Sequence, residues 1–141
     1  MKPIQKTIPR VTTTELRPLK QSELRKVAHE LYFQHCSGKE VKNIHLGIPI
    51  KFMPFAGRKT AHGEAVYSKK VAVIPILPKL IELATYNNFG QRKETDPLRI
   101  VGYLNFKAFV FIDDKKECLR IAVQFCKDGS FYYSIEVNKK K

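Results

Sequence analysis

The chain has 141 residues, with 26 Lys and Arg against 13 Asp and Glu, so its formal net charge is +13 at pH 7. Apolar residues make up 43% of the sequence, which excludes wholesale disorder and predicts one basic domain with a packed core. The longest nearly apolar run, residues 71–83, is shorter than the roughly 20 residues needed to cross a bilayer. We therefore expect no membrane insertion.

The positive charge predicts a polyanionic partner. Nucleic acid is favoured, because contact with cations releases the counterions condensed on its phosphates. An anionic membrane is the alternative, but the sequence contains neither a basic amphipathic helix nor a lipidation signal.

The sequence contains none of the common short motifs of metal or nucleotide chemistry. HExxH, GxxxxGK[ST] and GxGxxG are absent, and the three cysteines (Cys36, Cys118 and Cys126) form no CxxC pair. We therefore expect reduced thiols, no metal and no cofactor.

The first half of the chain predicts an arm and two helices. Residues 1–21 contain three prolines and read as an N-terminal arm or linker, with a short strand at 10–14, before a single domain over 22–141. Apolar residues at helical spacing predict a helix from residue 22 to a stop at Gly38. A second helix is expected from residue 69, with restarts at its two prolines, Pro75 and Pro78.

Two segments between these helices differ in character. Residues 41–55 mix extended apolar residues with Gly and Pro, which predicts one or two short strands with His45 and Lys51 opposite the apolar side. Residues 56–70 are the most polar interior stretch and carry Arg58, Lys59, Thr60 and His62. That stretch is the first candidate for chemistry.

After a charged loop at 87–97, the pattern predicts three strands: 100–112, 117–125 and 130–138. Turns at 113–116 and 127–129 connect them, with Gly129 in a left-handed conformation. The expected fold is α+β, with N-terminal helices packed on a C-terminal antiparallel meander.

The second turn sets a register between the last two strands. Phe125 would face Phe131 and Val123 would face Tyr133 on the core side, followed by the pairs Ile121–Ile135 and Leu119–Val137. The other side would be a polar face suited to holding phosphate, formed by Arg120, Ala122, Gln124, Tyr132, Ser134 and Glu136. An ordinary solvated face, with Arg120 paired to Glu136, is the alternative.

The order of these parts resembles the barnase, EndoU, colicin and RelE-like superfamily of small ribonucleases, in its phage branch of polyvalent proteins and polymorphic toxins. The matching segments are SGKEV at 37–41, HLGI at 45–48, AGRKT at 56–60, LPKLIELA at 77–84, FID at 111–113, LRIAV at 119–123 and DGSFYY at 128–133.

The resemblance implies a metal-independent endoribonuclease, often a toxin that cuts tRNA or mRNA in the cytoplasm, using the sheet surface and the loop before the second helix. It also implies a larger parent protein for delivery. A toxin would need an acidic immunity or antitoxin protein over its basic face. Because superfamily members use varied catalytic residues, the catalytic set must be assigned from this sequence.

RNA cleavage without metal needs a base for the ribose 2′-hydroxyl, a proton donor for the leaving 5′-oxygen and cations around the phosphorane, and it yields a 2′,3′-cyclic phosphate. His62 is the first choice for acid–base work, because Arg58 and Lys59 would favour its neutral form. Its alternative role is an ordinary loop histidine, and His45 is the reserve.

The remaining roles follow from the chemistry of the side chains. Lys59 and Arg120 would stabilise the phosphate charge, Thr60 would hydrogen-bond a phosphate oxygen, and Tyr132 would donate a hydrogen bond or stack on a base. The expected RNA contacts are Lys51, Arg58, Gln124 and Ser134. The competing function is a non-catalytic RNA- or DNA-binding module.

Overall fold

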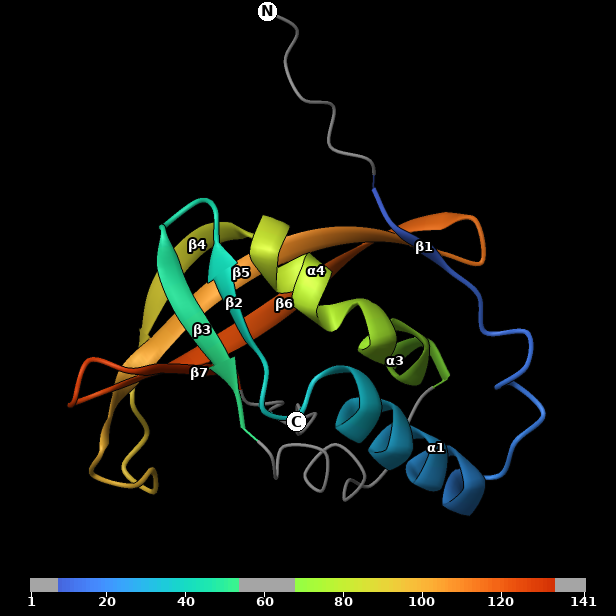
Figure 1. Ribbon diagram of the computed structural model, residues 1–141, viewed down its shortest axis with the longest axis horizontal. Helices are drawn as coiled ribbons and strands as arrows, with labels where there is room; N and C mark the ends of the chain where they lie inside the picture. Colours follow the sequence, from blue (N-terminus) through green and yellow to red (C-terminus); the bar gives the residue numbers. More distant parts are fainter. Residues whose placement is uncertain (1–7, 54–67, 134–141) are drawn as a thin grey trace, which may run out of the picture.

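Helices lie on one side of a curved β-sheet in the computed structural model, which describes residues 8–53 and 68–133 (Figure 1). Across these residues the sheet has seven strands in the order β1-β5-β6-β7-β3-β2, and β4 pairs with another part of β5. The chain is thus an α+β single domain with a mixed sheet. The strands are β1 (Arg10–Val11), β2 (Glu40–Asn43), β3 (Ile48–Phe52), β4 (Thr85–Gln91), β5 (Ile100–Ile112), β6 (Lys115–Cys126) and β7 (Phe131–Tyr133).

The first helix, α1 (Gln21–His35), confirms the helix expected from residue 22. Leu24, Ala28 and Tyr32 recur every four residues, so they share the buried stripe of the helix. At the start of α1, the Glu23 carboxylate accepts the backbone N–H of Lys20 at 3.0 Å. Beyond its end, Gly38 has φ +76°, the left-handed conformation expected of a helix stop.

The second helical segment consists of α3 (Ser68–Val73), the 3-10 turn η1 (Ile74–Ile76) and α4 (Leu77–Leu83). Pro75 and Pro78 stand in the first turns of η1 and α4, where a missing N–H costs no hydrogen bond. The predicted restarts are therefore confirmed. α4 contacts both β2 and β5, so the curved sheet packs against this helix and buries the face that carries Leu77, Leu80 and Ile81 (Figure 1).

The longest strands form the hairpin β5–β6. β5 has the predicted bounds, whereas β6 starts two residues earlier than predicted. The prediction of a four-residue turn at 113–116 is wrong. Asp113 and Asp114 both adopt positive φ, 51° and 66°, and close the hairpin as a two-residue turn. At the next turn, Gly129 has φ +88°, as predicted.

The pure meander is wrong, because segments from the first half of the chain join the sheet. β3 pairs in parallel with β7, and β1 pairs in parallel with the end of β5. These pairings satisfy backbone groups that a three-stranded meander would leave on open edges. β7 is described for residues 131–133, so the rest of the strand predicted over 130–138 lies outside the described residues.

The prediction of a charged loop at 87–97 is wrong for its first half, because residues 87–91 belong to β4. β4 is an edge strand with five exposed residues, so it shows little apolar alternation. Its place is set by its partner: the Phe89 ring packs over Gly102 of β5, where a Cβ would clash with it. The loop between β4 and β5 is residues 92–99.

Strands β2 and β3 confirm the two short strands expected within 41–55. In β3, Lys51 is exposed between buried Ile50 and Phe52, as its parity predicts. Ile44 and Leu46 are exposed, contrary to that pattern, because residues 44–47 form the turn between the two strands.

The turn at 44–47 is fastened to α4 by a fully buried side chain. Asn43 donates from Nδ2 to the carbonyl oxygens of Ile81 and Ala84, at 2.7 and 2.9 Å. Its Oδ1 accepts the N–H of Leu46 at 2.9 Å. These bonds satisfy carbonyls at the end of the helix and hold the β2–β3 hairpin against it.

The segment before α1 contributes β1, which covers only Arg10–Val11 of the strand expected at 10–14. Beyond it, the hydroxyl and the N–H of buried Thr13 both donate to the carboxylate of Asp113, the N–H at 2.9 Å. The division into an arm over 1–21 and a domain over 22–141 stays a prediction.

Candidate nucleic-acid interface

The register between β6 and β7 places two different surfaces on the sheet. Val123 pairs with Tyr133 and Phe125 with Phe131, as predicted, and the two phenylalanine rings stack with centroids 5.1 Å apart. These residues face the helices. We call the opposite side of β3, β5, β6 and β7 the outer face. The predicted partners Ile135 and Val137 lie outside the described residues.

One row of side chains crosses the outer face over four strands. Lys51 of β3 pairs with Tyr132 of β7, Tyr132 pairs with Gln124 of β6, and Gln124 pairs with Tyr103 of β5. Neighbours in such a row have Cβ atoms about 5 Å apart. The fold therefore brings together three predicted contact residues from distant parts of the chain: Lys51, Gln124 and Tyr132.

Gln124 is buried, whereas a residue on a solvated polar face would be exposed. Its side chain is 6% exposed, and Oε1 makes no hydrogen bond to the described part of the chain. An unpaired buried acceptor costs about 1–3 kcal/mol of stability. Tyr103 beside it is also buried and donates its hydroxyl to Asp96 Oδ2 at 2.7 Å.

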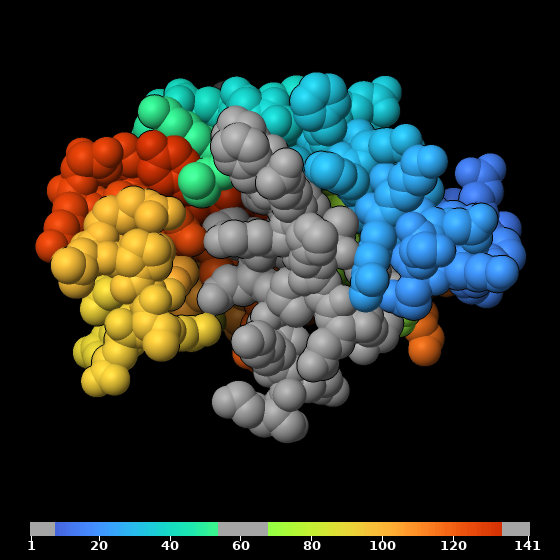
Figure 2. Space-filling view, turned by 90° about the horizontal axis from the view of Figure 1, so that it is seen from below, coloured from blue at the N-terminus to red at the C-terminus, as the bar shows by residue number. Residues whose placement is uncertain are grey.

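A pocket of about 370 Å³ lies at this end of the outer face. Three separate segments enclose it: the end of β3, the start of β5 and the β6–β7 turn. Figure 2 shows these segments, coloured green, orange and red, at the end of the molecule opposite the blue α1. We call it the Tyr132 pocket, and its lining residues are Met53, Arg99, Cys126, Lys127, Asp128 and Tyr132.

The Tyr132 pocket combines cations, a phenol and one carboxylate. The N–H of Ser130 donates to the Asp128 carboxylate at 2.9 Å and lowers its pKa, so Asp128 is ionised at neutral pH. Because Arg99 and Lys127 carry two positive charges against that single negative charge, the lining of the pocket is positive. Burial raises the pKa of Cys126, so its thiol stays protonated and is unsuited to nucleophilic attack. The pocket suits an anion with acceptor oxygens, such as a phosphate.

Two further cations face each other in the middle of the outer face. Lys107 of β5 pairs directly with Arg120 of β6, and both side chains are exposed. Neither forms an ion pair with any described residue, and Glu136, the alternative partner of Arg120, lies outside those residues. Like charges directly opposite each other destabilise a sheet, so their placement favours an external anion.

Five of the predicted site residues lie outside the described residues: Arg58, Lys59, Thr60, His62 and Ser134. The chain enters residues 54–67 immediately after Met53, which lines the Tyr132 pocket.

His45 lies in the β2–β3 turn, and its Nδ1 accepts the N–H of Tyr86 at 2.8 Å. In the neutral ring Nε2 then carries the proton, so this histidine presents a donor rather than a base.

Sequence reasoning missed several cations and aromatic residues of the outer face. Lys107 and Phe109 lie on β5, and their alternation with Phe106, Ala108 and Val110 could have placed them there. Arg99 and Lys127 lie next to strand ends, where no alternation of side chains indicates which face of the sheet they join.

Comparisons with known proteins place the domain in a family. The model of large polyvalent protein-associated domain 3 matches residues 20–133, about four fifths of the chain. The chain therefore belongs to this family of domains. No curated protein matches the sequence, and no solved structure does either.

Two further findings concern the residues that the structure describes. None of the helices in residues 8–53 and 68–133 is long and apolar enough to span a membrane. The same residues contain no group of three or more His, Cys, Asp or Glu that could hold a metal ion.

Proposed function

We propose that this domain is a metal-independent endoribonuclease of the barnase, EndoU, colicin and RelE-like type, acting as a toxin module within a larger polyvalent protein. The observation that carries the proposal is the Tyr132 pocket, where Arg99, Lys127 and the Tyr132 phenol line one space. Such a cluster would stabilise the charge that develops on a phosphorane.

The catalytic roles follow the sequence hypothesis. His62 removes the 2′-proton as the 2′-oxygen attacks phosphorus and gives a proton to the 5′-oxygen as it leaves. Lys59 and Thr60 contact the phosphate. Tyr132 donates to a phosphate oxygen, and Arg120 holds a neighbouring phosphate. The preferred substrate is tRNA, and an acidic antitoxin would cover the outer face in producing cells.

The test is incubation of the purified protein with total bacterial RNA in EDTA, followed by end-group mapping. We expect discrete fragments with 2′,3′-cyclic phosphates, and their loss in His62→Ala. Lys127→Gln and Tyr132→Phe should each slow cleavage about 100-fold, the scale for losing one donor to a transition-state anion. The matched control is Lys26→Gln, an exposed lysine on α1.

The second candidate is a binding module without catalysis, which the same basic face supports. Intact RNA with a salt-dependent mobility shift would favour it and overturn the ribonuclease. Loss of cleavage in Lys26→Gln equal to that in Lys127→Gln would exclude a specific role for the Tyr132 pocket.

A further inference from the structure

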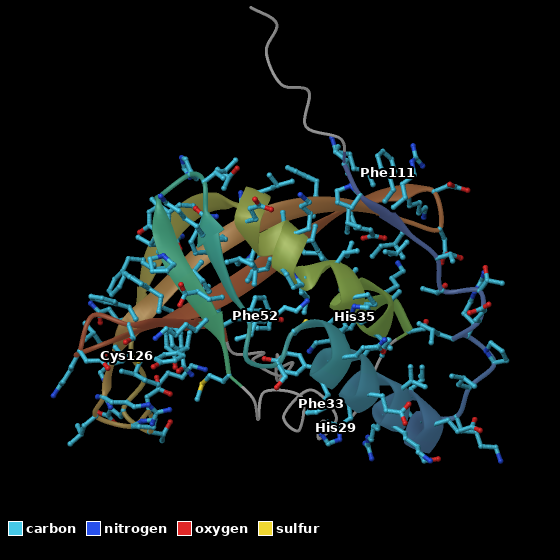
Figure 3. All side chains as sticks on the ribbon, viewed as in Figure 1. His29, Phe33, His35, Phe52, Phe111 and Cys126 are labelled. Carbon is cyan, nitrogen blue, oxygen red and sulfur yellow. The ribbon has the colours of Figure 1, made fainter. Side chains whose placement is uncertain are left out.

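Two phenylalanines lie at the end of the outer face remote from the Tyr132 pocket. Phe109 is 47% exposed, and Lys116 Nζ lies 4.8 Å from its ring centroid. Phe111, two residues further along β5, has the Arg10 guanidinium carbon 4.3 Å from its ring centroid. Figure 3 shows Phe111 and Cys126 near opposite ends of the β5–β6 hairpin. Each ring thus has one cation close to it.

The surroundings leave Phe109 accessible. Its partner across the strands is Cys118, an exposed thiol too small to cover a phenyl ring. On the other edge of β5, β4 pairs up to Lys107 and β1 pairs from Phe111 onward. Within the described residues no strand pairs with this edge of β5 at Phe109. A hollow of about 140 Å³ occupies this gap, and its walls include Pro9, Leu80, Leu83, Lys107 and Phe109.

The cations between the two ends define a track across the outer face. Gln124, beside the Tyr132 pocket, and Cys118, beside Phe109, are six residues apart on β6, about 20 Å at the rise of a strand. Lys107 and Arg120 lie between them. An exposed ring in a basic groove is the arrangement that binds single-stranded nucleic acid, because bases stack on the ring while cations contact phosphates. A duplex keeps its base faces stacked inside and could not use Phe109.

We propose that Phe109 is a base-stacking platform and that RNA crosses the outer face as a single strand from the Tyr132 pocket to Phe109. This inference rests on the proposed function for its choice of RNA as ligand. It adds the form of the substrate, a single strand of several nucleotides, and a recognition residue remote from the phosphate pocket.

The experiment measures binding of a fluorescently labelled 2′-O-methyl RNA strand to the full chain. This probe lacks the 2′-hydroxyl nucleophile, so binding is observed whether or not the protein cuts RNA. We expect Phe109→Ala to weaken binding about 5- to 100-fold, the range measured for losing one base-stacking aromatic. Phe109→Tyr retains an aromatic face and should bind within about twofold of the unmodified protein.

The controls separate stacking from loss of folding. Phe33→Ala removes a more exposed phenylalanine from α1 and should leave affinity unchanged. Equal affinity of Phe109→Ala and the unmodified protein would overturn the platform. So would absence of binding to the strand, or tighter binding of a duplex with the same oligonucleotide. If Phe109→Ala loses strand binding while natural RNA stays uncut, the platform stands and the ribonuclease proposal fails.

Discussion

Single carboxylates hold the turns of this protein by accepting backbone N–H groups. Asp96 accepts the N–H of Lys93 at 2.8 Å, and Asp113 and Asp128 accept those of Thr13 and Ser130. Hydrogen bonds to the ionised form lower the pKa of each of these groups. In a strongly basic protein these few acids therefore serve structure, and the outer face keeps its positive charge.

The Asp113 contact predicts a pH-dependent stability difference. The hydroxyl and then the N–H of Thr13 lower the pKa of Asp113 below its ordinary 3.8. A carboxyl with a lowered pKa stabilises the fold above its unfolded pKa and loses that contribution as pH falls through the folded pKa. Asp113→Asn keeps a residue that tolerates positive φ but removes the charge.

We therefore expect Asp113→Asn to have a lower melting temperature than the unmodified protein at about pH 7, and the gap to narrow below pH 3.8. Thermal unfolding followed by circular dichroism at several pH values measures it. A gap of the same size in acid would show that the carboxylate charge is unimportant at this turn.

At the scale of elements, the contact between β4 and β5 depends on a residue without a side chain. At Gly102 a Cβ would clash with the Phe89 ring and lie 2.6 Å from the carbonyl oxygen of Gly90. The ring can rotate away, but the backbone oxygen belongs to the paired strand and cannot.

Gly102→Ala should therefore destabilise the protein by about 1–3 kcal/mol, the usual range for overpacking. The double variant Phe89→Ala/Gly102→Ala should recover little, because the contact with the Gly90 oxygen remains. Urea unfolding of the two variants and of Phe89→Ala alone measures both effects. Full recovery in the double variant would assign the whole cost to the ring.

Elements with strong local signals were predictable, and elements placed by a neighbour were not. Apolar residues at helical spacing located α1, and the change from helical to alternating spacing located β5 to the residue. β4 lacks alternation because most of its side chains face solvent, so only its pairing with β5 defines it. The parallel contacts of β1 and β3 depend on long-range pairing, which no local pattern encodes.

At the scale of the whole molecule, the positive charge of the outer face lowers the stability of the fold. Lys107 and Arg120 repel each other across β5 and β6, and no described acid compensates them. A pair of this kind lowers stability at low salt but raises affinity for phosphates.

Lys107→Gln should therefore raise stability by a few tenths of a kcal/mol at low ionic strength, with a smaller gain in high salt. The same variant should reduce the slope of log affinity for single-stranded RNA against log salt by about 0.7, the value for one lost phosphate contact. Urea unfolding and a salt series of binding curves measure the two effects. Lys26→Gln on α1 should leave the slope unchanged, and a slope unaffected by Lys107→Gln would exclude this lysine from the track.

The sequence by itself determined the basic α+β character, the helix α1, the bounds of β5 and the register of β6 with β7, because these depend on composition, spacing and short turns. It also selected Gln124 and Tyr132 as residues of one polar surface, and Lys51 as an RNA contact. Only the tertiary structure decided that they form one row, that Gln124 is buried, and that Arg99 and Lys127 join Tyr132 around a pocket. The reason is physical: side-chain periodicity is a local property, whereas a pocket forms where strands distant in sequence pair, and those pairings depend on the packing of the whole sheet around α4.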